Sequence, residues 1–171
     1  VCRSLANASG CVVTSVGYLG DVAPFVEPAR RLARLGHEVL FVAPAGYRAL
    51  LADEPFGFMD YPLDLSAPAM HADPHHERLL RHPILNSPRL ARYSINGYFL
   101  ADPDRVISTL TDLLTGAAAV LTHITPAPVV VPLARQLGVP HVVGNAVPMR
   151  IPTDQRWTTF NTRTRSHGRR V

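Results

Sequence analysis

The chain has 171 residues, of which 47% are apolar and 18% are charged. This is an ordinary soluble composition, and the length suits a single domain that can bury a core without disulfides or metals. No stretch approaches the roughly 20 apolar residues that span a bilayer, and the N-terminus lacks the long apolar core of a signal peptide. We therefore expect a cytoplasmic protein.

The formal net charge of +4 is a property of the C-terminal end. Residues 1–155 hold 12 arginines and 13 acidic residues, whereas residues 156–171 hold five arginines and no acid. A nucleic-acid-binding face needs basic charge spread over folded structure, so we expect no nucleic-acid partner. Cys2 and Cys11 have neither CxxC spacing nor a nearby histidine, which argues against a disulfide framework and fits a reducing compartment.

The first third of the chain alternates strand-like and helix-like patterns. In chain order, the expected elements are a strand over 11–16, a loop over 17–21, a helix from about 22 that stops at Gly36, a strand over 37–43, a short helix over 47–52 and a strand over 56–62. Apolar runs that are buried on both sides and alternate with helices favour a mostly parallel sheet with helices on both faces. The predicted fold class is therefore a Rossmann-like α/β domain.

The rest of the chain continues this pattern after an interruption. Residues 64–88 are rich in Pro and His and have little periodicity, which predicts a long irregular excursion that is functional or mobile. The later expected elements are a helix over 88–99, a helix over 104–115 capped by Asp102, a strand over 117–122, a helix over 127–137 and a strand over 139–143. We expect an N-terminal extension over 1–10, one domain over 11–152, and an irregular, Arg-rich tail over 153–171 that ends in disorder.

The loop that follows the first expected strand is the first candidate site. Ligands of parallel α/β sheets lie beyond the carboxyl ends of the strands, and glycines at 17 and 20 allow a sharp turn and a close approach. Asp21 follows directly, and a carboxylate repels phosphate. The loop also fails the GxGxxG pattern, and no acid ends the second strand. These residues disfavour a dinucleotide site.

Five short segments carry a family resemblance: Gly-Asp-Val-Ala-Pro-Phe at 20–25, Ala-Arg-Leu-Gly-His-Glu-Val at 33–39, Phe-Val-Ala-Pro at 41–44, Leu-Thr-His at 121–123, and Leu-Gly-Val-Pro-His-Val-Val at 137–143. Together they resemble the N-terminal half of GT-B fold glycosyltransferases, in the UDP-glycosyltransferase-like branch with the sterol, glycopeptide-antibiotic and macrolide enzymes. The resemblance covers about residues 11–152. It implies an acceptor-binding half, and transfer of a hexosyl group from a nucleotide-sugar to a hydroxyl of a lipid, sterol or natural-product acceptor.

Asp21 occupies the position at which some members of this family carry a histidine base and others an aspartate. The resemblance therefore implies that Asp21 is the catalytic base that deprotonates the acceptor hydroxyl, which a positioned carboxylate can do. A nearby helix N-terminus would keep the carboxylate ionised. The residues alone favour a helix N-cap instead, and one side chain can serve both roles.

The remaining expected site residues surround the same end of the sheet. His123 ends a strand there and either lines the acceptor cleft, assists Asp21, or makes a structural hydrogen bond. The residues that we expect to bind substrate are Tyr18, Gly20, Phe25, His123 and Met149.

A cluster of histidines and acids suggests a metal site at first sight, but its spacing does not. The cluster comprises His71, Asp73, His75, His76, Glu77 and His82. Its spacing fits no HExxH pattern and no cysteine joins it. The family that the chain resembles needs no metal, so we expect a solvated, polar acceptor loop, no metal and no cofactor beyond the nucleotide-sugar co-substrate.

The family's C-terminal half, which holds the nucleotide-sugar, has no counterpart in this sequence. We expect the chain to be inactive alone, as a truncated or frameshifted product or as half of a split enzyme whose donor domain is a separate chain. The alternative function is a non-catalytic binding module for an apolar ligand. An unrelated nucleotide-binding domain is a third interpretation, and it predicts nucleotide affinity in this chain alone.

Overall fold

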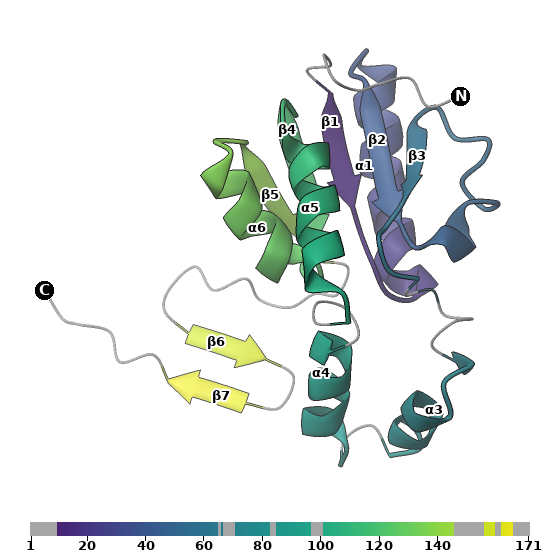
Figure 1. Ribbon diagram of the computed structural model, residues 1–171, viewed down its shortest axis with the longest axis vertical. Helices are drawn as coiled ribbons and strands as arrows, with labels where there is room; N and C mark the ends of the chain where they lie inside the picture. The colour runs from purple at the N-terminus through teal and green to yellow at the C-terminus, as the bar shows by residue number, and fades with distance from the viewer. Residues whose placement is uncertain are drawn as a thin grey trace, which may run out of the picture.

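The main sheet has five parallel strands, and its order puts the first strand at the centre. The computed structural model describes residues 10–64, 66, 71–82, 85–96, 101–145, 156–159 and 162–165. The strands are β1 Cys11–Thr14, β2 Val39–Ala43, β3 Gly57–Asp60, β4 Ala119–His123 and β5 His141–Gly144. They pair in parallel in the order β3-β2-β1-β4-β5 (Figure 1). The α/β, Rossmann-like fold class predicted from the sequence is confirmed.

Different helices bury the two faces of this sheet. On one face, α1 (Leu19–Arg34) packs Val22 and Phe25 into a core with residues of β1 and β2. On the other face, α5 (Pro103–Leu114) and α6 (Ala127–Gln136) supply a second core (Figure 1). Because both faces are covered, the inner strands are short apolar runs rather than alternating ones.

The start of α1 differs from the prediction, and the difference matters for the site. The helix begins at Leu19, so Gly20 and Asp21 lie in its first turn rather than in a loop. The helix starts early because the Asp21 carboxylate accepts the backbone N–H of Tyr18 at 2.9 Å, which closes the first turn. Apolar periodicity does not contain this signal. The predicted stop is confirmed, since Gly36 follows the C-cap with φ +89°.

The predicted irregular excursion over 64–88 is wrong in part. It contains the helix α3 (Pro74–Leu80) and the start of α4 (Ser87–Ile95). Asp73 caps α3 by accepting the N–H of His75 at 2.8 Å, and Pro74 stands at the first helical position. Only two side chains of α3 are buried, so a helix this short gives no apolar period to read.

Two further segments also depart from the prediction. A 3-10 helix, η1 (Ala45–Tyr47), stands where a helix over 47–52 was expected. In the tail, β6 (Arg156–Thr159) and β7 (Thr162–Arg165) pair antiparallel, so the expectation of an irregular, disordered end is wrong for these residues. The sequence of β6 is Arg-Trp-Thr-Thr, and that of β7 is Thr-Arg-Thr-Arg. Threonine is β-branched and tryptophan is aromatic, and both kinds of residue favour strands.

Candidate functional site

The candidate site lies where the central strand and its neighbour end. Thr14 of β1 pairs with Thr122 of β4, so the residues that follow both strands meet at one edge of the sheet. The chain turns after β1 and enters α1, which brings Asp21 back over this edge. Oδ1 of Asp21 then lies 4.0 Å from Nε2 of His123, the last residue of β4. The structure thus brings together two of the predicted site residues.

The Asp21 carboxylate is held from one side and open on the other. Its Oδ2 accepts the Tyr18 N–H, and its backbone carbonyl accepts the hydroxyl of Ser15 at 2.8 Å. The side chain is 34% exposed, so it reaches solvent. Asp21 is the third residue of α1 and Tyr18 is the N-cap, which corrects the predicted N-cap position of Asp21. The first turn of a helix favours a negative charge.

The two glycines of this turn have different roles. Gly17 has φ +124°, and a Cβ atom there would overlap the Asp21 carboxylate. The hydroxyl of Tyr47 donates to the Gly17 carbonyl at 2.9 Å and fixes the turn from the opposite side. A Cβ atom on Gly20 would meet nothing within 4 Å. Gly17 therefore allows a close contact within the protein, whereas Gly20 faces open space and its part in substrate binding stays a prediction.

His123 is a buried imidazole behind the carboxylate. It is 3% exposed, and the ring of Phe25 packs edge-on against it with a centroid distance of 5.4 Å. Burial lowers the pKa of His123, and the nearby Asp21 charge opposes that shift. No described residue forms a hydrogen bond with its Nδ1. The lowered pKa favours the neutral ring, and Asp21 is the more exposed member of the pair.

Phe25 contacts His123, and Tyr18 contacts Asp21. Phe25 is 4% exposed, and a Cβ atom on Gly144 of β5 would come within 2.9 Å of its ring, so Phe25 packs directly against the backbone of β5. The Tyr18 hydroxyl is buried and has no hydrogen-bond partner among the described residues. Burial, followed by the Asp21 charge, raises the pKa of Tyr18. Substrate binding by both stays a prediction, and Met149 lies outside the described residues.

The structure adds a group of stacked rings that the sequence did not predict. His76 of α3 is buried, and its ring stacks on Tyr93 of α4 with centroids 5.0 Å apart and an interplanar angle of 14°. The Tyr18 ring lies 6.3 Å from His76 and 5.8 Å from His71. The Tyr93 hydroxyl donates to Asp73 at 2.6 Å. These contacts connect the turn of Asp21 to α3 and α4, and they correct the prediction that the His-rich segment is solvated throughout.

The described part of the chain contains no cluster of three or more His, Cys, Asp or Glu side chains that is arranged to hold a metal ion. None of the described helices is both long enough and apolar enough to cross a bilayer.

A cavity of about 1010 Å³ lies at the other end of the sheet. It is lined by residues near the amino ends of β1 and β2, among them Cys11 and Glu38, and by the whole of β3. None of the predicted site residues contributes to it. Parallel α/β sheets bind their ligands at the carboxyl ends of the strands, so the edge with Asp21 is a better candidate for the functional site than this cavity.

Comparison with known proteins gives a match in fold. No protein-family model matches the chain, and no curated protein matches it. Among solved structures, Phytolacca americana UGT2, complexed with UDP-2fluoro-glucose and pterostilbene, matches with a TM-score of 0.51 and 19% identity over 81% of this chain. The kitacinnamycin glycosyltransferase matches with a TM-score of 0.51 and 17% identity over 81%. The Streptomyces sp. SF2575 glycosyltransferase SsfS6 matches with a TM-score of 0.51 and 20% identity over 79%.

These matches describe one domain of much longer proteins. The chain spans 30% of the Phytolacca and kitacinnamycin enzymes and 38% of SsfS6. The structure is thus similar to one domain of GT-B fold glycosyltransferases. At this level of identity the similarity concerns the fold.

Proposed function

We propose that this chain is the acceptor-binding half of a nucleotide-sugar-dependent glycosyltransferase, with Asp21 as the base. The observation that carries the proposal is a partly exposed carboxylate, held by the Tyr18 N–H, at the carboxyl end of the central strand. This is the edge at which parallel sheets bind ligands. The similarity in fold to glycosyltransferase domains supports the same function.

In the proposed reaction, the acceptor hydroxyl oxygen forms a bond to the anomeric carbon of the sugar. The bond between that carbon and the nucleotide diphosphate breaks, and the diphosphate leaves with the electron pair. The hydroxyl proton passes to Oδ1 of Asp21, the oxygen that does not accept the Tyr18 N–H, as the new bond forms. Because Oδ2 is held by the Tyr18 N–H, the carboxylate is already oriented before the acceptor binds.

Asp21 suits the role of base better than His123. The Asp21 side chain is 34% exposed and that of His123 is 3% exposed, so an acceptor reaches the carboxylate first. His123 lies behind it, 4.0 Å from Oδ1, where a neutral ring adds no competing positive charge.

The donor would be bound elsewhere. The chain spans about a third of the glycosyltransferases that it matches, so the proposal places the nucleotide-sugar on a second domain. That domain belongs to the remainder of a longer polypeptide or to a separate chain. The proposed acceptors are lipids, sterols or natural products with a free hydroxyl group.

The first experiment measures acceptor binding by the chain itself. Pterostilbene, a ligand in the Phytolacca complex, serves as a phenolic probe. Pterostilbene is titrated into the protein, and the backbone amide chemical shifts of the protein are followed by nuclear magnetic resonance. We expect the largest shift changes at residues 17–25 and at His123. Perturbations confined to the amino ends of the strands would contradict the assignment of the site.

The second experiment tests the role of Asp21 in transfer, with a donor-binding domain supplied. Replacing Asp21 by Asn keeps the shape and the N-cap contact but removes the base. We expect turnover to fall by a factor on the order of 10²–10⁴, with pterostilbene binding unchanged. Asp104→Asn, an exposed acid in the first turn of α5, is the matched control and should turn over normally. Full activity of the Asp21→Asn variant would refute the proposal.

A non-catalytic binding module for an apolar ligand is the second candidate function. The observation in its favour is that Asp21 already has a structural partner in the Tyr18 N–H. In this case the Asp21→Asn variant would bind pterostilbene normally, and the assembled protein would transfer no sugar with either residue.

A further inference from the structure

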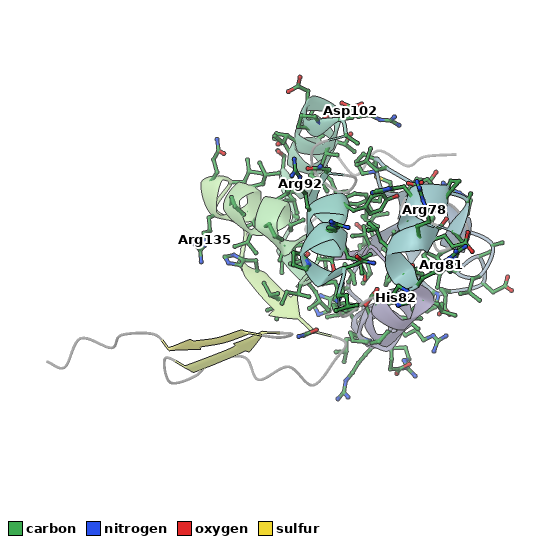
Figure 2. The ribbon with its side chains drawn as sticks, turned by 90° about the horizontal axis from the view of Figure 1, so that it is seen from below. Arg78, Arg81, His82, Arg92, Asp102 and Arg135 are labelled. Carbon is green, nitrogen blue, oxygen red and sulfur yellow. The ribbon has the colours of Figure 1, made fainter. Side chains whose placement is uncertain are left out.

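The helices α3 and α4 form a pair beyond the carboxyl ends of the strands. Figure 1 shows them below the sheet, at the end of the molecule from which α1 starts. Figure 2 looks at this end from below and shows Arg78, Arg81 and His82 around α3, and Arg92 on α4. Tyr93 and Asp73 join the two helices through their hydrogen bond.

The pair carries a local excess of positive charge. We define the basic end as the four exposed arginines of this region, namely Arg78, Arg81, Arg89 and Arg92. None of them forms an ion pair with another described residue. The region 71–96 contains only two acids: Asp73 accepts hydrogen bonds from Tyr93 and from the His75 backbone, and Glu77 is exposed. The net charge of residues 1–155 conceals this excess, because acids elsewhere balance it.

A large apolar side chain is exposed between the arginines of the basic end in the sequence. Leu85 stands in the turn between α3 and α4 and is 82% exposed. It lies four residues after Arg81 and four residues before Arg89 in the sequence. A leucine side chain has a higher free energy in water than in an apolar environment. A leucine flanked by arginines therefore matches a surface that is both anionic and apolar.

We propose that the basic end docks on an anionic lipid bilayer, with Leu85 inserted among the acyl chains and the four arginines at the headgroups. Basic residues near a membrane surface are attracted by anionic lipids, and apolar side chains beside them enter the interface. A nucleic acid would match the charge but would leave Leu85 exposed to water. The inference goes beyond the proposed function, and it would hold the acceptor edge of the sheet toward the membrane.

The experiment is flotation of the full chain with vesicles, without acceptor or donor, so its outcome does not depend on sugar transfer. One set of vesicles contains phosphatidylcholine and phosphatidylglycerol in about equal parts, and the other contains phosphatidylcholine alone. We expect binding to the anionic vesicles only, and weaker binding as ionic strength rises.

Charge-matched variants locate the surface. Each arginine near an anionic surface strengthens partitioning roughly fivefold, so Arg78→Gln with Arg81→Gln should weaken binding about 25-fold. Arg31→Gln with Arg135→Gln removes the same charge from exposed positions on α1 and α6 and should leave binding unchanged. Leu85→Gln keeps the charge and should weaken binding to the anionic vesicles.

Three results would overturn the proposal. The first is equal weakening by the two charge-matched pairs, which would indicate attraction by net charge alone. The second is equal binding to both vesicle types. The third is absence of binding to the anionic vesicles; if duplex DNA then binds in a manner that depends on Arg78 and Arg81, the basic end is assigned to nucleic acid. All variants replace exposed side chains, and circular dichroism of each variant would check that it is folded.

Discussion

The carboxylate of Asp21 occupies the space that a side chain on Gly17 would need. The contact links the backbone at Gly17 to the position of the candidate base. Gly17 keeps φ +124° in the turn. It must also lack a Cβ atom, because that atom would block the path of the carboxylate to the Tyr18 N–H. A residue that touches no ligand thereby sets the position of the proposed base.

Replacing Gly17 by Ala should destabilise the protein and displace Asp21. The strained backbone costs about 1–3 kcal/mol, and the overlap with the carboxylate adds to it. Gly36→Ala is the control, because Gly36 has φ +89° with open space around it and suffers from strain alone. Urea unfolding should give a larger loss for Gly17→Ala than for Gly36→Ala. Equal losses would show that the Asp21 contact is not constraining.

The pKa of His123 should depend on the charge of Asp21. Burial holds the pKa of His123 below its ordinary value of 6.5, and the Asp21 charge raises it against that effect. Asp21→Asn removes the opposing charge, so the pKa should fall further. Proton chemical shifts of the imidazole, followed against pH and assigned with a His123→Gln variant, provide the measurement. A pKa above 6.5 in the parent protein would contradict the buried, neutral ring.

The same shift makes stability depend on pH with a definite sign. Between the folded pKa of His123 and 6.5, the unfolded chain binds more protons than the folded one, so stability falls as pH decreases through this range. The stabilising contribution of the neutral His123 to the free energy of unfolding is fully present above pH 6.5. His123→Gln should flatten this part of the curve, which unfolding measured from weakly acidic to neutral pH would reveal. An unchanged slope would assign the acid sensitivity to other groups.

Removing the hydroxyl groups of two tyrosines should affect protein stability differently. The Tyr93 hydroxyl donates to Asp73, whereas the Tyr18 hydroxyl is buried without a described partner. Tyr93→Phe should therefore lower the urea midpoint. Tyr18→Phe removes an unsatisfied polar atom and should be neutral or stabilising. A loss for Tyr18→Phe would indicate that its hydroxyl has a partner in solution.

The sequence predicted the sheet well because each buried parallel strand is a short apolar run that can be recognised from its own residues. The apolar runs that became β1, β2, β4 and β5 each sit between glycine or proline signals, and Gly36 stops α1 where expected. Prediction failed where a single side chain decides the outcome. The Asp21 contact that starts α1 at Leu19 and the Asp73 cap that starts α3 leave no apolar period.

The candidate site was predicted in its members but not in its arrangement. Asp21 and His123 were expected at one edge, and the order of β1 and β4 places them there. The stacking of His76 on Tyr93 and the basic end depend on how two short helices pack. Such packing joins residues through contacts that neither composition nor periodicity contains.

The central position of β1 has a consequence for how the protein is made. β1 needs β4 as a neighbour, and about one hundred residues that follow β1 in the chain must be synthesised before that neighbour exists. Until then β1 pairs with β2 alone and keeps an unpaired edge. Because Asp21 and His123 come from opposite ends of this interval, the proposed acceptor site forms only when most of the domain has been translated.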